Sequence, residues 1–350
     1  MFPERYKIID GPLNGGMSSV YLCKDTILER NVAIKVLQEV TESRRMADEI
    51  SALLKLRSKH VVQVLDLLEV GEGHGIVQEY VEGHDLCHLP ALPTDAEATY
   101  KHLWQIAAGI ADIHLAGVIH RDVKPNNMKI DPEGVIKIFD FGLARDQNRN
   151  SSTMGFVGTY GFAAPELFDA PATFTFAVDV YAFGATALHV VAKGIPAALR
   201  TPTRPTGLPA LFFDQFNSGL SDEVLRLLES CMDVNPNRRP TMQVVRDALA
   251  RHLLHDRHQA LAVYQGQPHL LTKSKRSVTA SWANVASVKI SYDGFRFFVA
   301  ELSGEVYINY GLATQGQSLP ESCVVALGAP ERGAARKYIT FDLSHPEVVL

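Results

Sequence analysis

The stretch His120-Arg-Asp-Val-Lys-Pro-Asn-Asn127 decides how the rest of this 350-residue chain is interpreted. Asp122 is a carboxylate able to accept a hydroxyl proton, and Lys124 is a cation able to neutralise a transferring phosphoryl group. Asn127 offers an amide oxygen of the kind that a hard cation takes as a ligand. Folding propensity does not account for this cluster. If the octet is a catalytic loop, other functional groups must occur at set places on either side of it.

Upstream of the octet, the chain has a glycine-containing hairpin and a strand that carries a lysine. The glycine pair Gly15–Gly16 lies between two strand-like segments and would let the backbone approach phosphate oxygens. A plain hairpin turn is the alternative for this segment taken alone. The apolar run Val32–Leu37 contains Lys35, and a lysine inside an apolar strand is costly unless it is paired. Lys35 therefore needs an anion or a carboxylate.

A helix predicted over residues 42–57 supplies one such carboxylate. Glu49 lies on the same face as the apolar residues that recur at helical spacing, so Glu49 and Lys35 can pair. The alternative is that Glu49 is a solvated charge at the helix edge, as charged helix residues usually are. The apolar face is formed by Met46, Ile50, Leu53 and Leu54.

The remainder of the first 120 residues predicts a small sheet followed by a helix. Residues 61–70 and 75–81 are two more strands, which complete a five-stranded sheet with one helix. Residues 82–85 form a linker into a second lobe. Residues 98–116 form an amphipathic helix, and Gly117 suits the position just past its end.

Downstream of the octet, a short strand at 135–139 leads into Asp140-Phe-Gly142. Residues 143–163 lack periodicity and are predicted to be a mobile surface segment that ends at Ala164-Pro-Glu166. The rest of the chain to residue 254 is predicted to be helical, with a proline-rich connection over 196–219.

Beyond residue 255 the pattern changes to short strands and turns, which predicts a small all-β unit of about 80 residues. His252, His255 and His258 are three residues apart near a helix end. This spacing drifts around a helix, and no carboxylate or cysteine joins them, so metal binding there is disfavoured. The predicted strands are 276–281, 285–291, 295–302, 305–309, 323–327 and 337–343.

Bulk composition excludes several classes of protein. The formal net charge of −5 and the pI of about 6.2 disfavour a nucleic-acid or membrane-surface partner. The four cysteines are scattered, which indicates buried thiols in a reducing compartment rather than disulfides. The first residues carry charge and have no apolar core, and no run reaches the ~18 apolar residues of a membrane span. A cytoplasmic location is expected.

Together these motifs resemble the protein kinase superfamily, and in particular its bacterial-type serine/threonine members, over roughly residues 6–254. The resemblance rests on V-A-I-K, the helix glutamate, H-R-D-x-K-P-x-N, D-F-G, A-P-E and a late Asn235-Pro…Arg239, which occur in the family's order and spacing. It implies an α+β, bilobal kinase fold with an N-lobe (1–81) and a C-lobe (82–254). A linker (255–268) and the β-rich unit (269–350) would follow.

The resemblance also implies a role for each charged residue of the constellation. Lys35 would hold the α- and β-phosphates of ATP and pair with Glu49. Asp122 would orient the substrate hydroxyl and accept its proton, and Lys124 would contact the γ-phosphate. The metal ligands would be Asn127 and Asp140, holding Mg²⁺ or, alternatively, Mn²⁺.

Further positions of the family motifs define the nucleotide pocket and the support of the C-lobe. The family implies a hinge from Glu79 to Val81, with Gln78 as the gatekeeper. The loop and strands around the nucleotide would contribute Leu13, Gly15, Gly16, Val20 and Ala33. Leu13 departs from the family's glycine, which puts ATP affinity in doubt but not the fold. Glu166 would pair with Arg239, and Asp179 would brace the catalytic loop.

The same resemblance indicates the substrate class. Lys124 after Val123 is the serine/threonine type of loop, and Thr159 would bond to Asp122. Arg121 is typical of kinases switched by phosphorylation of the activation loop, because an arginine can pair with a phosphate. Autophosphorylation is therefore predicted within Ser151, Ser152 and Thr153, and the substrates would be proteins with serine or threonine.

Three alternatives remain at this point. The chain could be a pseudokinase that binds nucleotide as a scaffold, which the intact catalytic set disfavours. It could be a small-molecule phosphotransferase, which A-P-E disfavours. The β-rich unit, for which no family is evident, is either a regulatory domain with a protein or small-ligand partner or a structural support of the C-lobe.

Overall fold

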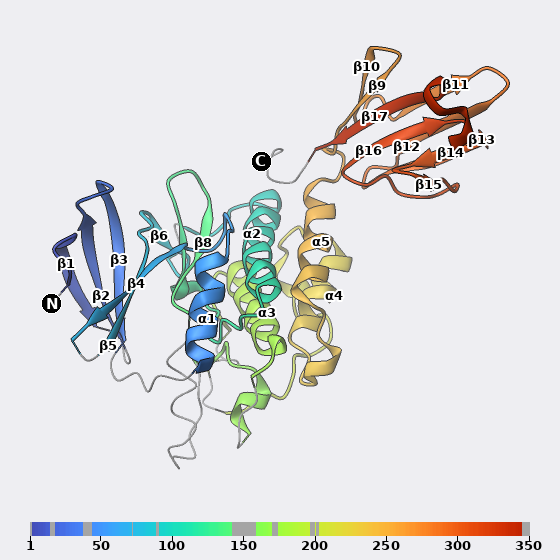
Figure 1. Cartoon of the computed structure of the whole chain (residues 1–350). Coiled ribbons are helices and arrows are strands. Elements are labelled where there is room, and N and C mark those ends of the chain that lie inside the picture. The colour runs from blue at the N-terminus through green and yellow to red at the C-terminus, as the bar shows by residue number, and fades with distance from the viewer. Residues whose placement is uncertain are drawn as a thin grey trace. The chain divides into compact units, whose positions relative to one another are not determined.

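The computed structural model describes residues 2–14, 18–37, 44–71, 73–88, 91–141, 159–169, 174–196, 200 and 203–344. The chain divides into two compact units, Met1–Arg246 and Asp247–Leu350, and each is described by itself (Figure 1). The division falls within helix α5 (Met242–Leu253).

The first unit begins with a five-stranded antiparallel sheet in the order β1-β2-β3-β5-β4. This confirms the predicted five-stranded sheet with one helix. The fourth strand along the chain begins three residues later than predicted, and the fifth begins and ends two residues earlier than predicted. The elements are β1 (Tyr6–Asn14), β2 (Ser18–Asp25), β3 (Arg30–Leu37), β4 (Val64–Val70), β5 (Gly73–Glu79) and the helix α1 (Arg44–Lys55).

Strand β3 carries two sets of side chains because successive residues point to opposite faces of a sheet. Val32 and Ile34 are fully buried in an apolar cluster with Cys23 and Val77. Lys35 lies on the other face, opposite Val20 of β2 in the strand register. The alternation therefore directs the strand lysine away from the core of the small sheet.

The second part of this unit is helical. Helix α2 (Ala96–Leu115) begins at Asp95, whose carboxylate accepts a hydrogen bond of 2.8 Å from Ala98 N. Helix α3 (Phe176–Ala192) is buried along most of its length, as expected for a helix that is apolar all round. Its N-cap residue is Thr175, whose side-chain hydroxyl accepts a hydrogen bond from Ala177 N. Helix α4 is Asp222–Cys231.

A small three-stranded sheet connects the catalytic octet to the helices. It consists of β6 (His84–Asp85), β7 (Met128–Ile130) and β8 (Ile136–Ile138). Helix α2 packs closely against this region at Gly109, where an added Cβ would lie 2.8 Å from His60 O and 2.9 Å from Ile138 Cδ1. A larger residue at Gly109 would push α2 away from β8.

The second unit contains a six-stranded sheet and a three-stranded sheet that share one apolar core (Figure 1). The six-stranded sheet has the order β10-β9-β17-β16-β14-β15, and the other has the order β11-β12-β13. The strands are β9 (Ala260–Tyr264), β10 (Gln267–Leu271), β11 (Ser277–Trp282), β12 (Ala286–Tyr292), β13 (Phe297–Gly304), β14 (Val306–Ile308), β15 (Gly311–Leu312), β16 (Ser322–Leu327) and β17 (Lys337–Leu343).

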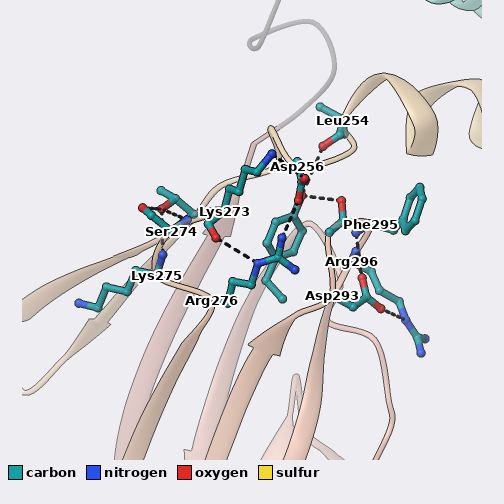
Figure 2. Close-up of polar contacts among 12 residues, drawn as sticks. Leu254, Asp256, Lys273, Ser274, Lys275, Arg276, Asp293, Phe295 and Arg296 are labelled. Atoms are coloured by element: carbon teal, nitrogen blue, oxygen red, sulfur yellow. Dashed lines mark hydrogen bonds and ion pairs between the residues drawn. The ribbon is translucent and has the colours of Figure 1, made fainter. Parts of the chain in front are cut away.

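The segment predicted to be a linker, residues 255–268, is instead part of the β unit. It contains all of β9. Asp256, which precedes β9, is bonded to Lys273 and Arg276, which lie between β10 and β11 (Figure 2). The Asp256 backbone N–H donates to Gly294 O at 2.8 Å, and the Asp256 carboxylate accepts from Lys273 Nζ at 2.9 Å and from Arg276 at 2.8 Å. Strand β9 was missed because its short apolar run lies next to a helix end.

The three histidines near the end of α5 contact aromatic rings. His252 and His255 pack on the ring of Phe295, with centroids 5.5 and 4.4 Å away. His258 packs on Phe297 and has its Nδ1 2.8 Å from Ser344 Oγ. Within the described ranges, none of the helices has the length and apolar character needed to cross a membrane.

Candidate active site

The strand lysine contacts the residues that follow β8. Lys35 is 8% exposed, and its Nζ donates to Asp140 Oδ1 and, at 3.2 Å, to Phe141 O. The anion that Lys35 needs is thus present in this structure as the Asp140 carboxylate. Glu49 lies on α1, but its side chain is outside the described residues, so the predicted Lys35–Glu49 pair stays a prediction.

The polar side chains of the octet surround the Asp122 carboxylate. Lys124 Nζ is 2.9 Å from Asp122 Oδ2, and Asn127 Nδ2 donates to the same oxygen at 3.0 Å. Thr159 comes from beyond the undescribed segment, and its hydroxyl donates to Asp122 Oδ1 at 3.4 Å while it accepts from Lys124 at 3.1 Å. The contact predicted between Thr159 and Asp122 is therefore present.

The two residues predicted to hold a metal lie on adjacent segments. Phe139 N donates to Asn127 O at 3.0 Å, which places Asp140 directly after a residue bonded to Asn127. The amide nitrogen of Asn127 is used by Asp122, so its amide oxygen is left to face a cation. Asp140 has one carboxylate oxygen beyond the one bonded to Lys35. Oxygen donors of this kind fit a hard divalent cation such as Mg²⁺.

Below the octet, a buried carboxylate holds the loop backbone. Asp179, which is 1% exposed, accepts from His120 N at 2.7 Å and from Arg121 N at 2.9 Å. It also lies 3.0 Å from His114 Nε2. Arg121 has a left-handed φ of 68°, a conformation that persists in a non-glycine residue only where the surroundings fix it. The bond to Asp179 supplies that fixation, as the predicted brace requires.

The burial and the hydrogen bonds of the octet's histidine favour its neutral form. Burial lowers the pKa of His120 below its usual value. Its Nδ1 accepts from Asp122 N at 3.3 Å, and its Nε2 donates to Phe139 O at 3.0 Å. One tautomer satisfies both bonds without a charge, so His120 links the octet to the segment that carries Asp140.

The predicted pair in the C-lobe is also present. Arg239 donates two bonds to the Glu166 carboxylate, at 2.6 and 2.8 Å, and its side chain is fully buried. A further bond of 2.8 Å reaches Ala177 O at the start of α3. The buried fork of Arg239 therefore ties the segment around Glu166 to helix α3.

A cavity of about 310 Å³ lies next to Asp140 and contains most of the described residues predicted to contact nucleotide. Glu79 lines it, and its carboxylate forms an ion pair with Lys137 Nζ, 2.7 Å away. The lining residues are Leu13, Val20, Leu22, Ala33, Val62, Gln78, Glu79, Tyr80, Val81, Asp85, Asn126, Lys129, Phe139 and Asp140.

Several of these lining residues were not predicted from the sequence. Val62 and Phe139 are apolar residues without a motif, and only tertiary packing brings them to the cavity. Asp85 was assigned to a linker, although its position just after the predicted hinge was the signal that could have identified it.

Some predicted residues cannot be located. Gly15, Gly16 and the three phosphorylation candidates Ser151, Ser152 and Thr153 lie outside the described residues. The predictions for them stand as predictions.

Comparison with known proteins agrees with this geometry. The family model "Protein kinase domain" matches residues 14–253. Serine/threonine-protein kinase PrkC of Bacillus subtilis is 33% identical over 201 residues, which is 55% of this chain and 31% of PrkC. A probable serine/threonine-protein kinase of Clostridium perfringens is 33% identical over 205 residues, which is 55% of this chain and 29% of that protein.

Among solved structures, Rad53 residues 1–466 in complex with AMP-PNP matches with a TM-score of 0.55 and 24% identity, over 69% of this chain and 64% of that one. That likeness supports the fold. The five-stranded sheet, the helical lobe and the octet between them define a protein of the bilobal kinase fold. The chain belongs to the protein kinase domain family. It matches only about a third of the length of the two curated relatives named above.

Proposed function

We propose that this protein is a serine/threonine protein kinase that transfers the γ-phosphate of ATP to hydroxyl groups of protein substrates. The observation that carries the proposal is the Asp122 carboxylate, held by Lys124, Asn127 and Thr159 at distances of 2.9 to 3.4 Å. These are the groups that phosphoryl transfer to a hydroxyl requires.

The cavity is the proposed nucleotide site. Its apolar lining from Val20, Ala33 and Val62 suits an adenine ring, and Lys35 lies beside Asp140, which lines the cavity. The related solved structure contains an ATP analogue, AMP-PNP. We infer that Lys35 neutralises phosphate oxygens when nucleotide binds, since a buried lysine requires an anionic partner.

Asn127 and Asp140 would hold Mg²⁺, or Mn²⁺ as the alternative. Such an ion, when bound, supplies charge neutralisation to the phosphates.

The residues of the octet then position the acceptor hydroxyl. Its oxygen forms a bond to the γ-phosphorus as the bond between that phosphorus and the β–γ bridging oxygen breaks. The hydroxyl proton moves to Asp122. Lys124 lies close enough to the carboxylate to offset negative charge that develops on the transferred group.

We propose serine/threonine specificity on the names of the curated relatives and on Thr159, which contacts both Asp122 and Lys124. We further propose that the protein phosphorylates its own Ser151, Ser152 or Thr153, for which the sequence pattern is the support.

The experiment measures incorporation of labelled phosphate from Mg-ATP by the wild type and by Asp140→Ala. The wild type is expected to label itself and a general protein substrate. The variant should lose about 100-fold or more of this activity, because it lacks a metal ligand. Equal incorporation of labelled phosphate by both proteins would contradict the proposed kinase activity. Nucleotide binding without incorporation of phosphate by either protein would favour a pseudokinase.

Mass spectrometry of the labelled wild type then locates the phosphate. Phosphate on Ser151, Ser152 or Thr153 is the expected result. Labelled protein without phosphate anywhere between Asp146 and Thr159 would contradict autophosphorylation of this segment while leaving the kinase activity intact.

For the β unit, we propose a regulatory or partner-binding role. The support is that the unit has a complete apolar core of its own, formed by both of its sheets. A domain that served only as a structural support would gain most of its stability from the surface that it covers. The apolar core of the β unit can stabilise the unit without such a surface.

A further inference from the structure

Between the predicted hinge and helix α2, three side chains of different chemistry converge. Asp85, Cys87 and His88 each offer one ligand atom, a carboxylate oxygen, a thiol sulfur and an imidazole nitrogen. The three atoms lie within 4.8 Å of one another. In the part of the chain that the structure describes, no other group of three such side chains comes together in this way.

The backbone of this turn is fixed by its neighbours. Strand β6 pairs with β7, with Asp85 opposite Lys129. Leu86 is fully buried, and its N–H donates to Met128 O at 2.9 Å. His88 N donates to Asp85 O at 3.0 Å, which closes a turn that brings residues 85, 87 and 88 to the same side. The donor atoms are thus presented by an anchored segment, which lowers the entropic cost of binding.

The side chains themselves are open to a ligand. Asp85 and His88 form no side-chain hydrogen bond or ion pair with any residue in the described ranges. Burial and the Asp85 carboxylate raise the pKa of Cys87, so its thiol is not a reactive thiolate. Modification of Cys87 as a nucleophile is therefore disfavoured. The Asp85 carboxylate supplies a negative charge that a divalent cation would offset.

The mixture of donors selects the ion. Mg²⁺ and Ca²⁺ prefer sites built only from oxygen, whereas Zn²⁺ is commonly bound by thiolate, imidazole and carboxylate together. Side-chain rotation can shorten the separations of 4.8 Å or less to those of a tetrahedral site. Three protein ligands would leave a fourth position for water. The Cys87 thiol would lose its proton to solvent as the zinc–sulfur bond forms.

We propose that Asp85, Cys87 and His88 form a Zn²⁺ site that regulates the nucleotide cavity. Asp85 belongs to both, because it also lines the 310 Å³ cavity together with Val81 and Lys129. A zinc ion bound to Asp85 occupies its carboxylate and places a bulky metal centre beside the nucleotide cavity. Zinc therefore weakens nucleotide binding, and nucleotide weakens zinc binding by the same factor. The regulatory half of this inference rests on the proposed function.

The metal half is tested on the full chain, freed of metal with a chelator and without nucleotide. Titration with Co²⁺ should give the near-ultraviolet absorption of a thiolate bound to cobalt, and calorimetry with Zn²⁺ should give one site. Cys87→Ser and His88→Gln should each weaken Zn²⁺ binding about 100-fold or more. This loss is larger than the roughly 10–100-fold loss expected when a residue that only supports a ligand is replaced. His84→Gln, an exposed histidine on the same strand that is not in the group, is the matched control and should bind like the wild type.

A wild type without the thiolate band, or Cys87→Ser that binds Zn²⁺ as tightly as the wild type, would overturn the site. Thermal unfolding of each variant checks that it is folded. If His84→Gln lost binding as fully as His88→Gln, the assignment of the ligand would be wrong.

The regulatory half is tested with a non-hydrolysable ATP analogue. Its affinity should fall about tenfold at saturating Zn²⁺, because the Asp85 carboxylate at the cavity is then occupied by the ion, and should be unaffected by Zn²⁺ in Cys87→Ser. Equal affinity with and without Zn²⁺ would refute the regulation alone. An analogue that failed to bind under any condition would refute the proposed nucleotide site, while one-site zinc binding would still establish the metal site.

Discussion

The two units of this protein keep their polar groups in different places. In the described ranges, every buried polar or charged side chain belongs to the first unit, and several of them lie in the octet or bond to it, among them His120, Asp122, Asn127 and Asp179. In the β unit, the buried side chains are apolar, and charged pairs such as Lys289–Glu301 and Arg276–Asp256 lie at the surface.

The difference shows what each unit is built to do. Burying a polar group costs free energy unless every bond it needs is formed, so a region that buries many of them is stabilised by exact pairing. The octet region buries polar side chains despite this cost, whereas the β unit buries mainly apolar ones. The first region should therefore be sensitive to the loss of single polar atoms, and the second to changes of volume in its core.

The largest effect is expected from Asp179→Ala. This change leaves the backbone N–H groups of His120 and Arg121 buried without an acceptor, at a cost of about 3–5 kcal/mol. It also releases the left-handed Arg121, so Asp122 shifts and phosphoryl transfer should fall on the order of 100-fold. Denaturant unfolding and a kinase assay measure the two effects.

Asp169→Ala is the matched control for that change. Asp169 forms an ion pair with Arg204 at 2.7 Å, but both side chains are about half exposed. A surface pair of this kind contributes at most about 1 kcal/mol. If Asp169→Ala destabilised the protein as much as Asp179→Ala, burial would not be the property that distinguishes the octet region.

The same contrast explains how far the sequence could be interpreted. The fold of the first unit and the pairs Thr159–Asp122, Glu166–Arg239 and Asp179 with the octet could be predicted, because each depends on a polar residue at a fixed place in a motif. Polar constellations leave such signatures in a sequence.

Apolar packing leaves weaker signatures in a sequence than polar motifs do. Strand β9 was assigned to a linker, because a run of five residues beside a helix end has no clear period. The contact of Lys35 with Asp140 could not be predicted either, since the two residues are 105 positions apart and only tertiary structure brings them together. Likewise, Val62 and Phe139 reach the cavity by packing alone.

A change of volume in the β unit should have an intermediate effect. Ile290 on β12 is fully buried in the shared core, so Ile290→Ala removes apolar contacts and leaves a cavity, at a cost of about 2–5 kcal/mol. Each unit has one of the two tryptophans, Trp104 in the first and Trp282 in the second. Fluorescence of a Trp104→Phe background therefore reports unfolding of the β unit.

Val324→Ala on β16 is the control for that substitution, because its side chain is 40% exposed and its truncation should cost under about 0.5 kcal/mol. Kinase activity of Ile290→Ala separates the two roles considered for the β unit. Altered activity in a protein whose first unit stays folded favours regulation. Loss of the first unit's own unfolding transition would instead favour a structural support.

The smallest effect concerns pH. Burial lowers the pKa of His258, although the Glu321 carboxylate offsets part of this effect. Above the unfolded value of about 6.5, His258 is neutral in both states. As the pH falls through 6.5, the unfolded state binds a proton that the folded state does not, so stability is lost. His258→Gln should reduce the pH dependence of β-unit unfolding between pH 7.5 and 5.5 by less than about 1.4 kcal/mol per pH unit. Ser344→Ala removes the hydroxyl that is bonded to His258 Nδ1 and Gln259 N but keeps the imidazole, so it should keep the wild-type slope. Equal slopes in His258→Gln and the wild type would show that another group is responsible.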